Sequence, residues 1–229
     1  MILLLDYDGT LTPIVSDPAE AKIEPARKKF LTELAKRHTL AMITGRDIES
    51  LRGVFGDIPP TIYVITSHGA SIYRNGRLLK RFATAKAPDL SSLKEKLSSV
   101  KGVIIEEKEG CFAVHYRKVG EKEEERVKEA FREFIEKYPP KKVIEGKKVL
   151  EAVYGGFDKG TAVKNFLEFI KWDGQEPVIY IGDDTTDRDA LRAVKELGGT
   201  GVFVGERKPP EADILLKNVE EVYEFLRSL

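Results

Sequence analysis

Short apolar runs alternate with amphipathic segments over the first 65 residues of the chain. Residues 2–5 are apolar without interruption, which is typical of a strand buried on both faces in a parallel sheet. Residues 24–37 follow, with apolar side chains at helical spacing on one face. The same alternation continues beyond them. The predicted strands are 2–5, 40–43 and 62–65, and the predicted helices are 24–37 and 48–55.

A different pattern occupies the middle of the chain. Asn75-Gly76 between two strand-like runs predicts a hairpin, because this pair suits a type I′ turn. Beyond the hairpin the order is helix, two strands, helix, two strands, which favours an antiparallel sheet with helices on one face. The predicted helices run through 90–100 and 121–138, and the predicted strands are 103–105, 111–116, 143–144 and 149–153.

The alternating pattern resumes near residue 156 and continues to the end of the sequence. An alternating order of strands and helices favours a doubly wound parallel sheet. We therefore expect a Rossmann-like α/β core formed by residues 1–84 and 156–229, with an inserted α+β cap domain at 85–155. The predicted elements of the second part are helices at 159–170 and 187–197, strands at 177–181 and 202–204, and a final strand and helix.

The composition of the chain argues against several kinds of binding partner and metal site. The 229 residues include 38 Lys and Arg against 38 Asp and Glu, so the formal net charge is zero, which argues against a general nucleic-acid binder. Cys111 is the only cysteine, which excludes an intramolecular disulfide and a Cys-rich metal site. The first apolar run is too short for a signal peptide, and no stretch approaches the roughly 20 apolar residues of a membrane span. We expect a cytoplasmic protein, most simply a monomer, with neither nucleic acid nor a membrane as partner.

Aspartates gather where strands of the predicted core end. Asp6 and Asp8 follow the first strand, and residues 183–187 include three more aspartates after a later strand. The carboxyl ends of parallel strands are where such sheets bind ligands. Any one aspartate is more simply a helix cap or turn residue, but the set needs a joint explanation, because clustered carboxylates repel each other unless a cation holds them. Oxygen ligands without His or Cys favour Mg²⁺.

These positions resemble the motifs of the haloacid dehalogenase superfamily of phosphotransferases. The first motif, Asp-x-Asp-Gly-Thr, corresponds to residues 6–10, and the second, a Thr or Ser after a strand, corresponds to Thr44. The third motif, a lysine, corresponds to Lys159, and the fourth, an acidic pair, corresponds to Asp183 and Asp187. All four occur in order across the predicted core, so the resemblance implies a phosphatase with this fold.

The resemblance also implies a catalytic role for four residues. Asp6 attacks phosphorus and forms an aspartyl-phosphate. Asp8 protonates the leaving sugar oxygen and then takes a proton from the water that cleaves the intermediate. Lys159 offsets the negative charge, and the Thr44 hydroxyl donates to a phosphoryl oxygen.

A metal site follows from the same resemblance. It implies that Mg²⁺ is held by the Asp6 carboxylate, the main-chain carbonyl of Asp8 and the Asp183 carboxylate, and that the ion neutralises phosphoryl charge. Asp184 and Asp187 are expected behind this site, where they orient the motif lysine or metal-bound water.

The similarity extends into the predicted cap, where the chain resembles the trehalose-6-phosphate phosphatase family. The matching segments are residues 6–13, 44–46, 67–70, Glu106-Glu107-Lys108, His115-Tyr116-Arg117, 146–151 and 158–160. The resemblance implies that a set of polar residues contacts the sugar-phosphate substrate. These residues are Arg46, His68, Glu106, Lys108, Arg117, Lys147 and Glu151.

The cap residues suit a ligand rich in hydroxyl groups. Glu106 and Lys108 are expected on one face of a strand, and Lys147 and Glu151 on one face of another. Together they supply paired acceptors and donors. Taken alone, each is more simply a surface charge on a strand. His68 is equally consistent with substrate contact and with support of a turn.

One departure from the family pattern follows Glu151. Family members usually continue with a basic residue and Pro, whereas this chain has Ala152, Val153 and Tyr154.

From the resemblance we expect Mg²⁺-dependent hydrolysis of trehalose 6-phosphate. The alternatives are a related phosphatase for sucrose phosphate, a mannosylglycerate phosphate or a hexose phosphate, and a non-catalytic sugar-phosphate sensor. Such sensors commonly lose a nucleophile or a metal ligand, and this chain keeps both.

Overall fold

The computed structural model describes residues 1–82, 86–108 and 110–229, with the main chain but not the side chain of Lys108. The chain forms two compact units. The first consists of Met1–Phe82 and Phe157–Leu229, and the second of Ala83–Gly156. Within the three described stretches, no helix has both the length and the apolar character that crossing a membrane requires.

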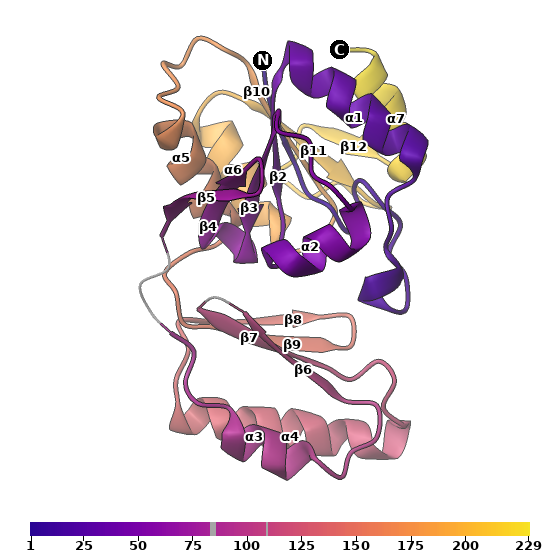
Figure 1. The fold of residues 1–229 in the computed structure, drawn as a ribbon, viewed down its shortest axis with the longest axis vertical. Helices are drawn as coiled ribbons and strands as arrows, with labels where there is room; N and C mark the ends of the chain where they lie inside the picture. The colour runs from indigo at the N-terminus through magenta and orange to yellow at the C-terminus, as the bar shows by residue number, and fades with distance from the viewer. Residues whose placement is uncertain (83–85, 109) are drawn as a thin grey trace. The chain divides into compact units, whose positions relative to one another are not determined.

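The first unit is built on an eight-stranded sheet (Figure 1). In chain order its strands are β1 (Ile2–Leu5), β2 (Thr39–Ile43), β3 (Ile62–Thr66), β4 (Ser71–Arg74), β5 (Arg77–Arg81), β10 (Val178–Gly182), β11 (Thr200–Val204) and β12 (Ile214–Leu216). Across the sheet they are ordered β12-β11-β10-β1-β2-β3-β4-β5. Every pair from β12 to β3 is parallel, which confirms the predicted core. The predicted hairpin is confirmed as an antiparallel edge of the same sheet.

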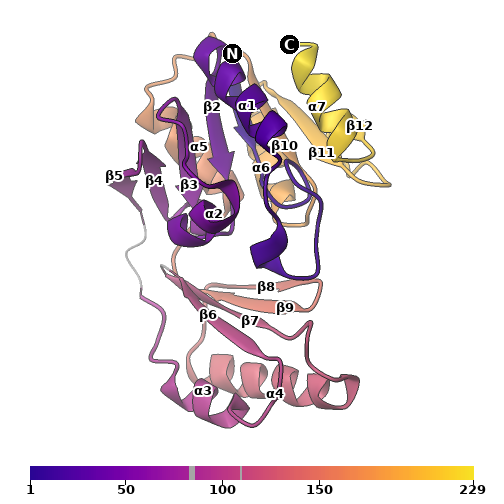
Figure 2. The ribbon, with the colours of Figure 1, turned by 45° about the vertical axis from the view of Figure 1, so that its right-hand side comes forward.

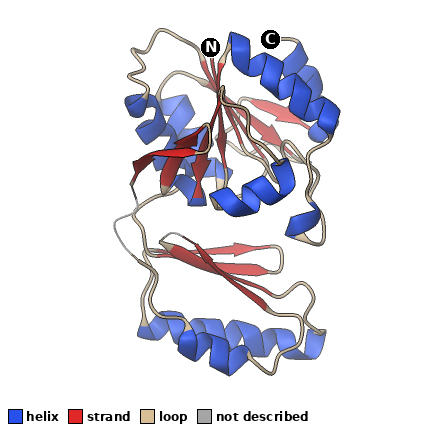
Figure 3. Ribbon diagram, in the orientation of Figure 1, coloured by secondary structure: helices blue, strands red, loops and turns tan. Residues whose placement is uncertain are grey.

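Helices cover both faces of this sheet (Figure 3). Side chains of a strand alternate between the two faces, so Leu3 and Leu5 join the core on one side and Leu4 joins the core on the other. A strand buried in this way must be apolar at every position, which explains the uninterrupted run at the start of the chain. The helices on one face are α1 (Pro25–Arg37), α2 (Ile48–Phe55) and α7 (Val219–Arg227), and those on the other are α5 (Lys159–Phe169) and α6 (Asp187–Glu196).

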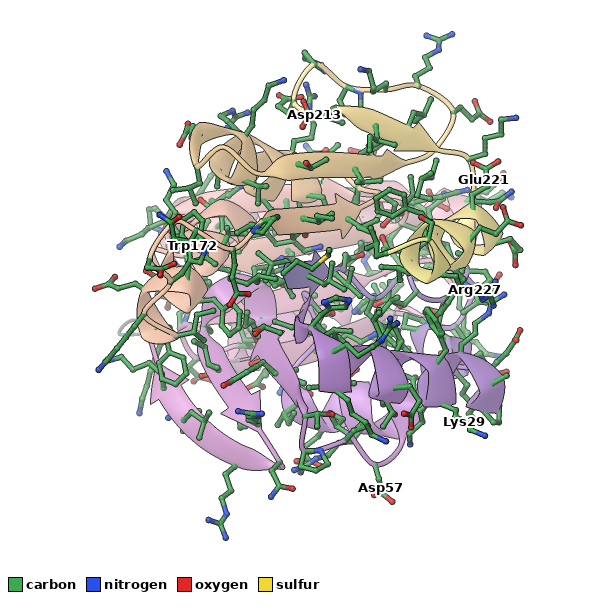
Figure 4. The ribbon with its side chains drawn as sticks, turned by 90° about the horizontal axis from the view of Figure 1, so that it is seen from above. Lys29, Asp57, Trp172, Asp213, Glu221 and Arg227 are labelled. Atoms are coloured by element: carbon green, nitrogen blue, oxygen red, sulfur yellow. The ribbon has the colours of Figure 1, made fainter. Side chains whose placement is uncertain are left out.

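Helices α1 and α7 lie side by side on their face of the sheet. Phe30 of α1 meets Tyr223 of α7 edge to face, with ring centroids 6.0 Å apart, and Arg27 lies over the Tyr223 ring. Charged side chains of the same two helices, including Lys29 and Arg227, lie on the outside (Figure 4). The last helix is therefore packed against the first.

The parallel register brings the ends of β1, β2 and β10 to one edge of the sheet. Leu5, the last residue of β1, is level with Met42 and Ile181. The next residue, Asp6, still donates its main-chain N–H to the Ile181 carbonyl at 2.9 Å. Polar residues that follow these strands are therefore neighbours in space, although they are far apart in the sequence.

The second unit is a four-stranded antiparallel sheet with two helices on one face (Figure 2). Its strands are ordered β6 (Ile104–Lys108), β7 (Cys111–His115), β9 (Val149–Val153) and β8 (Lys142–Gly146). The helix-side core includes Phe112 and Ala152 from the sheet and Phe131 from a helix. The predicted succession of elements is confirmed: α3 (Ser91–Leu97), β6 (Ile104–Lys108), β7 (Cys111–His115), α4 (Glu121–Lys137), β8 (Lys142–Gly146) and β9 (Val149–Val153).

One expectation for this unit is wrong. Lys147 does not share a strand with Glu151, because β8 ends at Gly146 and Lys147 lies in the turn that leads into β9. The next residue, Lys148, has a left-handed φ of 65°, which marks the tight turn. Arg117 likewise lies beyond the end of β7.

Candidate active site

Three buried side chains form a chain of ion pairs at the strand ends. Asp6 follows β1, Lys159 is the first residue of α5, and Asp187 is the first residue of α6. The Lys159 ammonium donates to Asp6 Oδ1 at 2.7 Å and to Asp187 Oδ1 at 2.6 Å. None of the three is more than 4% exposed. A lysine enclosed between two carboxylates in this way is held in one place.

The start of α5 determines where Lys159 stands. The Asp158 side chain caps the helix by accepting from the Thr161 N–H at 2.7 Å. The Thr161 hydroxyl in turn accepts from the Asp158 N–H at 2.7 Å, which completes a capping box. This reciprocal cap fixes the first turn, so Lys159 enters the site from the first position of the helix.

The Asp187 carboxylate is saturated with hydrogen-bond donors. Its Oδ1 accepts from Lys159 and from the Tyr180 hydroxyl. Its Oδ2 accepts from the main-chain N–H groups of Asp183 and Asp184, at 3.1 and 2.9 Å. A carboxylate offers about four lone-pair sites, so none remains on Asp187 for a metal ion. The geometry makes Asp187 a partner of Lys159.

Asp183 lies against the turn that contains the first motif. Gly9 has a φ of +87°, and a Cβ at this position would come within 2.0 Å of Asp183 Oδ2. Only glycine permits both this backbone conformation and this close approach. The Thr10 hydroxyl also donates to Asp183 Oδ1, at 3.4 Å. Asp184, by contrast, is exposed and its side chain accepts from the Thr185 N–H at 2.6 Å.

Burial shifts the proton affinity of these groups. Burial raises the pKa of Asp6; Lys159 opposes this effect, and the charge of Asp187 adds to it. Burial also raises the pKa of Asp183, together with the charges of Asp6 and Asp187. For Lys159, burial alone would lower the pKa, but the two carboxylates outweigh it and raise the pKa above its usual range. Lys159 therefore stays cationic, and one cation does not balance the three aspartates.

The acidic cluster has the donor set of a hard metal ion. Asp6, Asp183 and Asp187 each offer a carboxylate oxygen, and these atoms all lie within 4.8 Å of one another. Because the oxygens of Asp187 are already engaged, Asp6 and Asp183 are the two that can bind an ion. Oxygen donors without His or Cys fit Mg²⁺.

Asp8 is bound by Arg46. The Arg46 Nε and Nη2 atoms each donate to one oxygen of Asp8, at 2.7 Å. The same guanidinium donates to the Pro18 carbonyl at 2.7 Å and to Ser50 Oγ at 3.1 Å. The Arg46 side chain is only 9% exposed, against 40% for Asp8. The sequence predicts that Arg46 contacts the substrate, and in the structure its guanidinium contacts Asp8.

Thr44 and His68 belong to the turns after β2 and β3. The buried Thr44 hydroxyl accepts from the Arg46 N–H at 3.1 Å. A hydroxyl that accepts through a lone pair still has its hydrogen to donate. The His68 main-chain N–H donates to the Thr44 carbonyl at 3.0 Å, and its ring lies so close to Gly45 that a Cβ there would be 2.7 Å from it. These contacts favour turn support over substrate contact for His68.

In the second unit, two predicted sugar ligands share the sheet face opposite the helices. Glu106 and Glu151 both stand level with Ala113, one on each neighbouring strand. Glu151 is buried, with 7% exposed. His115 Nε2 donates to Glu106 Oε2 at 2.9 Å, so the histidine of the motif holds the first glutamate in place.

The other three predicted cap ligands stand nearer the ends of these strands. Arg117 donates through Nη2 to the Lys147 carbonyl at 2.9 Å, which joins two turns of this unit. The Lys108 side chain lies outside the described residues. Ala152, where the family usually has a basic residue, packs into the helix-side core, on the opposite face from Glu151. The departure from the family pattern therefore does not change the Glu151 face.

Sequence reasoning missed Tyr180 and the pairing of Arg46 with Asp8. Tyr180 has the only polar side-chain atom in β10, a strand that leads directly into the acidic motif. A hydroxyl in an otherwise apolar buried strand needs a partner, and that requirement was the available signal. Nothing in the local pattern identifies Asp8 as the partner of Arg46, because the two are 38 positions apart.

The chain is similar to proteins of one named family. Residues 4–213 match the family model described as trehalose-phosphatase. The chain is 33% identical over 248 residues to trehalose-phosphate phosphatase B of Arabidopsis thaliana, an alignment that covers the whole chain and 66% of that protein. It is 31% identical over 253 residues to trehalose 6-phosphate phosphatase RA3 of Zea mays, covering the whole chain and 69% of that protein. The chain thus spans about two thirds of the length of these relatives.

Solved structures share the fold. The C-terminal domain of Candida albicans trehalose-6-phosphate phosphatase matches with a TM-score of 0.79 and 25% identity, over 98% of this chain and 90% of that one. A haloacid dehalogenase-like hydrolase from Bacteroides thetaiotaomicron matches with a TM-score of 0.70 and 17% identity, over 99% of this chain and 98% of that one. The second match concerns the fold alone, and it agrees with the predicted haloacid dehalogenase fold.

Proposed function

The chain belongs to the trehalose-phosphatase family, and from that premise we propose that it hydrolyses trehalose 6-phosphate to trehalose and phosphate. The observation that carries the proposal is the buried chain of Asp6, Lys159 and Asp187. It presents a carboxylate nucleophile beside a fixed positive charge. This combination favours transfer of a negatively charged phosphoryl group to the carboxylate.

Asp6 is the proposed nucleophile. One oxygen of its carboxylate forms a bond to phosphorus while the bond from phosphorus to the sugar oxygen breaks. Asp8 releases one of its two bonds to Arg46, carries a proton on the freed oxygen and gives that proton to the departing sugar oxygen. In the second step Asp8 takes a proton from water, the water oxygen bonds to phosphorus, and the bond from Asp6 to phosphorus breaks, which restores both residues.

Lys159 and Thr44 stabilise the charge on the transferred group. Lys159 already contacts the Asp6 oxygen, so its ammonium stands beside the site of transfer without rearrangement. The Thr44 hydroxyl oxygen accepts from the Arg46 N–H, which orients the hydroxyl so that it donates to a phosphoryl oxygen. Both groups are buried, where such contacts are stronger than in water.

We propose a magnesium site at Asp6, Asp183 and the main-chain carbonyl of Asp8. Support comes from the closeness of the carboxylate oxygens and from the raised pKa of Asp6 and Asp183, which burial causes first and the neighbouring carboxylates increase. When bound, Mg²⁺ supplies positive charge to the phosphoryl group. Asp187, whose oxygens are engaged, positions Lys159 instead.

Residues of the second unit are the proposed ligands of the sugar. Glu106 and Glu151 offer acceptors from one sheet face, and both lie within the residues that match the family model. The resemblance implies that Arg46 and His68 of the first unit contact the substrate as well, and the Arg46 guanidinium is bound to Asp8. The full proposed set in the second unit is Glu106, Lys108, Arg117, Lys147 and Glu151.

Phosphate release from a panel of sugar phosphates tests the proposal. The panel contains trehalose 6-phosphate, sucrose phosphate, a mannosylglycerate phosphate and glucose 6-phosphate, each with and without Mg²⁺. We expect the highest kcat/KM with trehalose 6-phosphate, no turnover by Asp6→Asn, and normal turnover by the exposed control Asp57→Asn. Faster turnover of another sugar phosphate would overturn the substrate, and full activity of Asp6→Asn would overturn the covalent mechanism.

A further inference from the structure

Tyr180 has a polar atom in an otherwise apolar environment. It lies in β10, is fully buried, and packs in the same core as Leu4 and Phe166. The neighbouring side chains of this core therefore fix the position of the Tyr180 ring. The hydroxyl donates to Asp187 Oδ1, so its partner is a side chain of the candidate active site and not a structural carbonyl.

Two donors share the same oxygen of Asp187. Lys159 donates to Oδ1 at 2.6 Å, and the Tyr180 hydroxyl donates to it from the strand. An acceptor that serves two donors binds each less strongly than it would bind one. The Tyr180 hydroxyl therefore weakens the attraction of Asp187 for the lysine, which leaves Lys159 able to contact Asp6 at 2.7 Å as well.

We propose that Tyr180 is a positioning residue that keeps the Lys159 ammonium shared between Asp187 and Asp6, where the phosphoryl group is transferred. The catalytic consequence rests on the proposed function, whereas the effect on the hydrogen bonds does not. Tyr180 acts through Asp187 and Lys159 and needs no contact with substrate. Burial raises the pKa of Tyr180 well above its usual value, so the hydroxyl remains a donor.

The variant Tyr180→Phe removes this one hydroxyl. We expect kcat to fall about ten-fold with trehalose 6-phosphate and with p-nitrophenyl phosphate alike, and each KM to stay within about two-fold, because the loss concerns the transition state. The matched control is Tyr223→Phe. The Tyr223 side chain is also buried, and its hydroxyl donates to the Leu11 carbonyl at 3.0 Å.

The control separates positioning from general packing. Both variants lose one buried hydroxyl, so similar decreases in Tm are expected, but only Tyr180→Phe should lose kcat. An unchanged kcat in Tyr180→Phe, or an equal loss in Tyr223→Phe, would overturn the proposal. If Tyr180→Phe does not fold, Tyr180→Met replaces it with the same expectation, because Met also lacks a donor and fills irregular space.

A crystal structure of the variant gives a readout that does not depend on turnover. The distance from Lys159 Nζ to Asp6 Oδ1 is expected to lengthen beyond hydrogen-bonding range while the contact with Asp187 persists. An unchanged distance would contradict positioning even if kcat fell. If the wild-type enzyme released phosphate from none of the sugar phosphates, the proposed function would fail, and this distance would still decide the role of Tyr180.

Discussion

Arg46 holds Asp8 by both carboxylate oxygens, with two donor–acceptor distances of 2.7 Å. The guanidinium is itself anchored to Pro18 and Ser50. The buried Arg46 side chain, which follows β2, therefore sets the orientation of Asp8, the proposed general acid. Asp8 can turn toward a ligand only by releasing one of these two bonds.

Arg46→Lys is expected to lower kcat by about ten-fold and to leave KM for trehalose 6-phosphate nearly unchanged, because a lysine cannot reproduce a two-pronged contact. Steady-state phosphate release measures both constants. The control is Arg52→Lys, in which the altered side chain makes an exposed pair with Glu49. A raised KM with normal kcat would instead favour the direct substrate contact predicted from the sequence.

Removal of divalent metal with EDTA is expected to abolish phosphate release, and Mg²⁺ is expected to restore it. In Asp183→Asn the Mg²⁺ concentration for half-maximal rate should rise at least about ten-fold, because one charged oxygen ligand is lost. The exposed Asp173→Asn serves as control. An identical Mg²⁺ requirement in Asp183→Asn and in the control would refute the proposed ligand.

Glu106→Ala and Glu151→Ala test the sugar-binding face. Each is expected to raise KM for trehalose 6-phosphate about ten-fold or more through lost hydrogen bonds to hydroxyl groups, with little change for p-nitrophenyl phosphate. Glu107→Ala is a matched control from the same strand, where the glutamate is exposed and pairs with Lys94. Parallel losses on both substrates would mean that these glutamates serve stability.

The buried ring nitrogens of His38 are expected to make the stability of the protein depend on pH. Within the described residues, both its ring nitrogens are buried without a hydrogen-bond partner. Burial lowers the pKa of His38 below 6.5, helped by the amino group of Met1 and by Arg37 and opposed by Glu176. The unfolded chain then binds the proton more tightly, so the free energy of unfolding falls as the pH drops through 6.5.

Urea unfolding of wild type and His38→Gln at about pH 7 and about pH 5 measures this effect. The variant is expected to lose about 0.5 kcal/mol less than wild type over this interval, a modest value because the residue is only partly buried. Equal losses in the two proteins would show that His38 does not contribute.

Prediction from sequence was most successful where a strand is buried on both faces. The run at 2–5 matches β1 residue for residue, since a strand buried on both faces must be apolar throughout. It was least successful at turns. Lys147 was expected on a strand and lies in a turn, because no periodicity marks the last residue of a strand.

The sequence by itself determined the order of core and cap elements and the residues that follow each strand, because apolar spacing and motif order are local properties. Only the tertiary structure decided which side chains meet. Arg46 with Asp8, Tyr180 with Asp187 and Asp183 against Gly9 are contacts set by strand register and packing. The first and the last of these join positions that are distant in the chain, and the second depends on the direction in which a side chain leaves its strand. Such choices depend on the assembled sheet, in which parallel strands bring their ends to one edge.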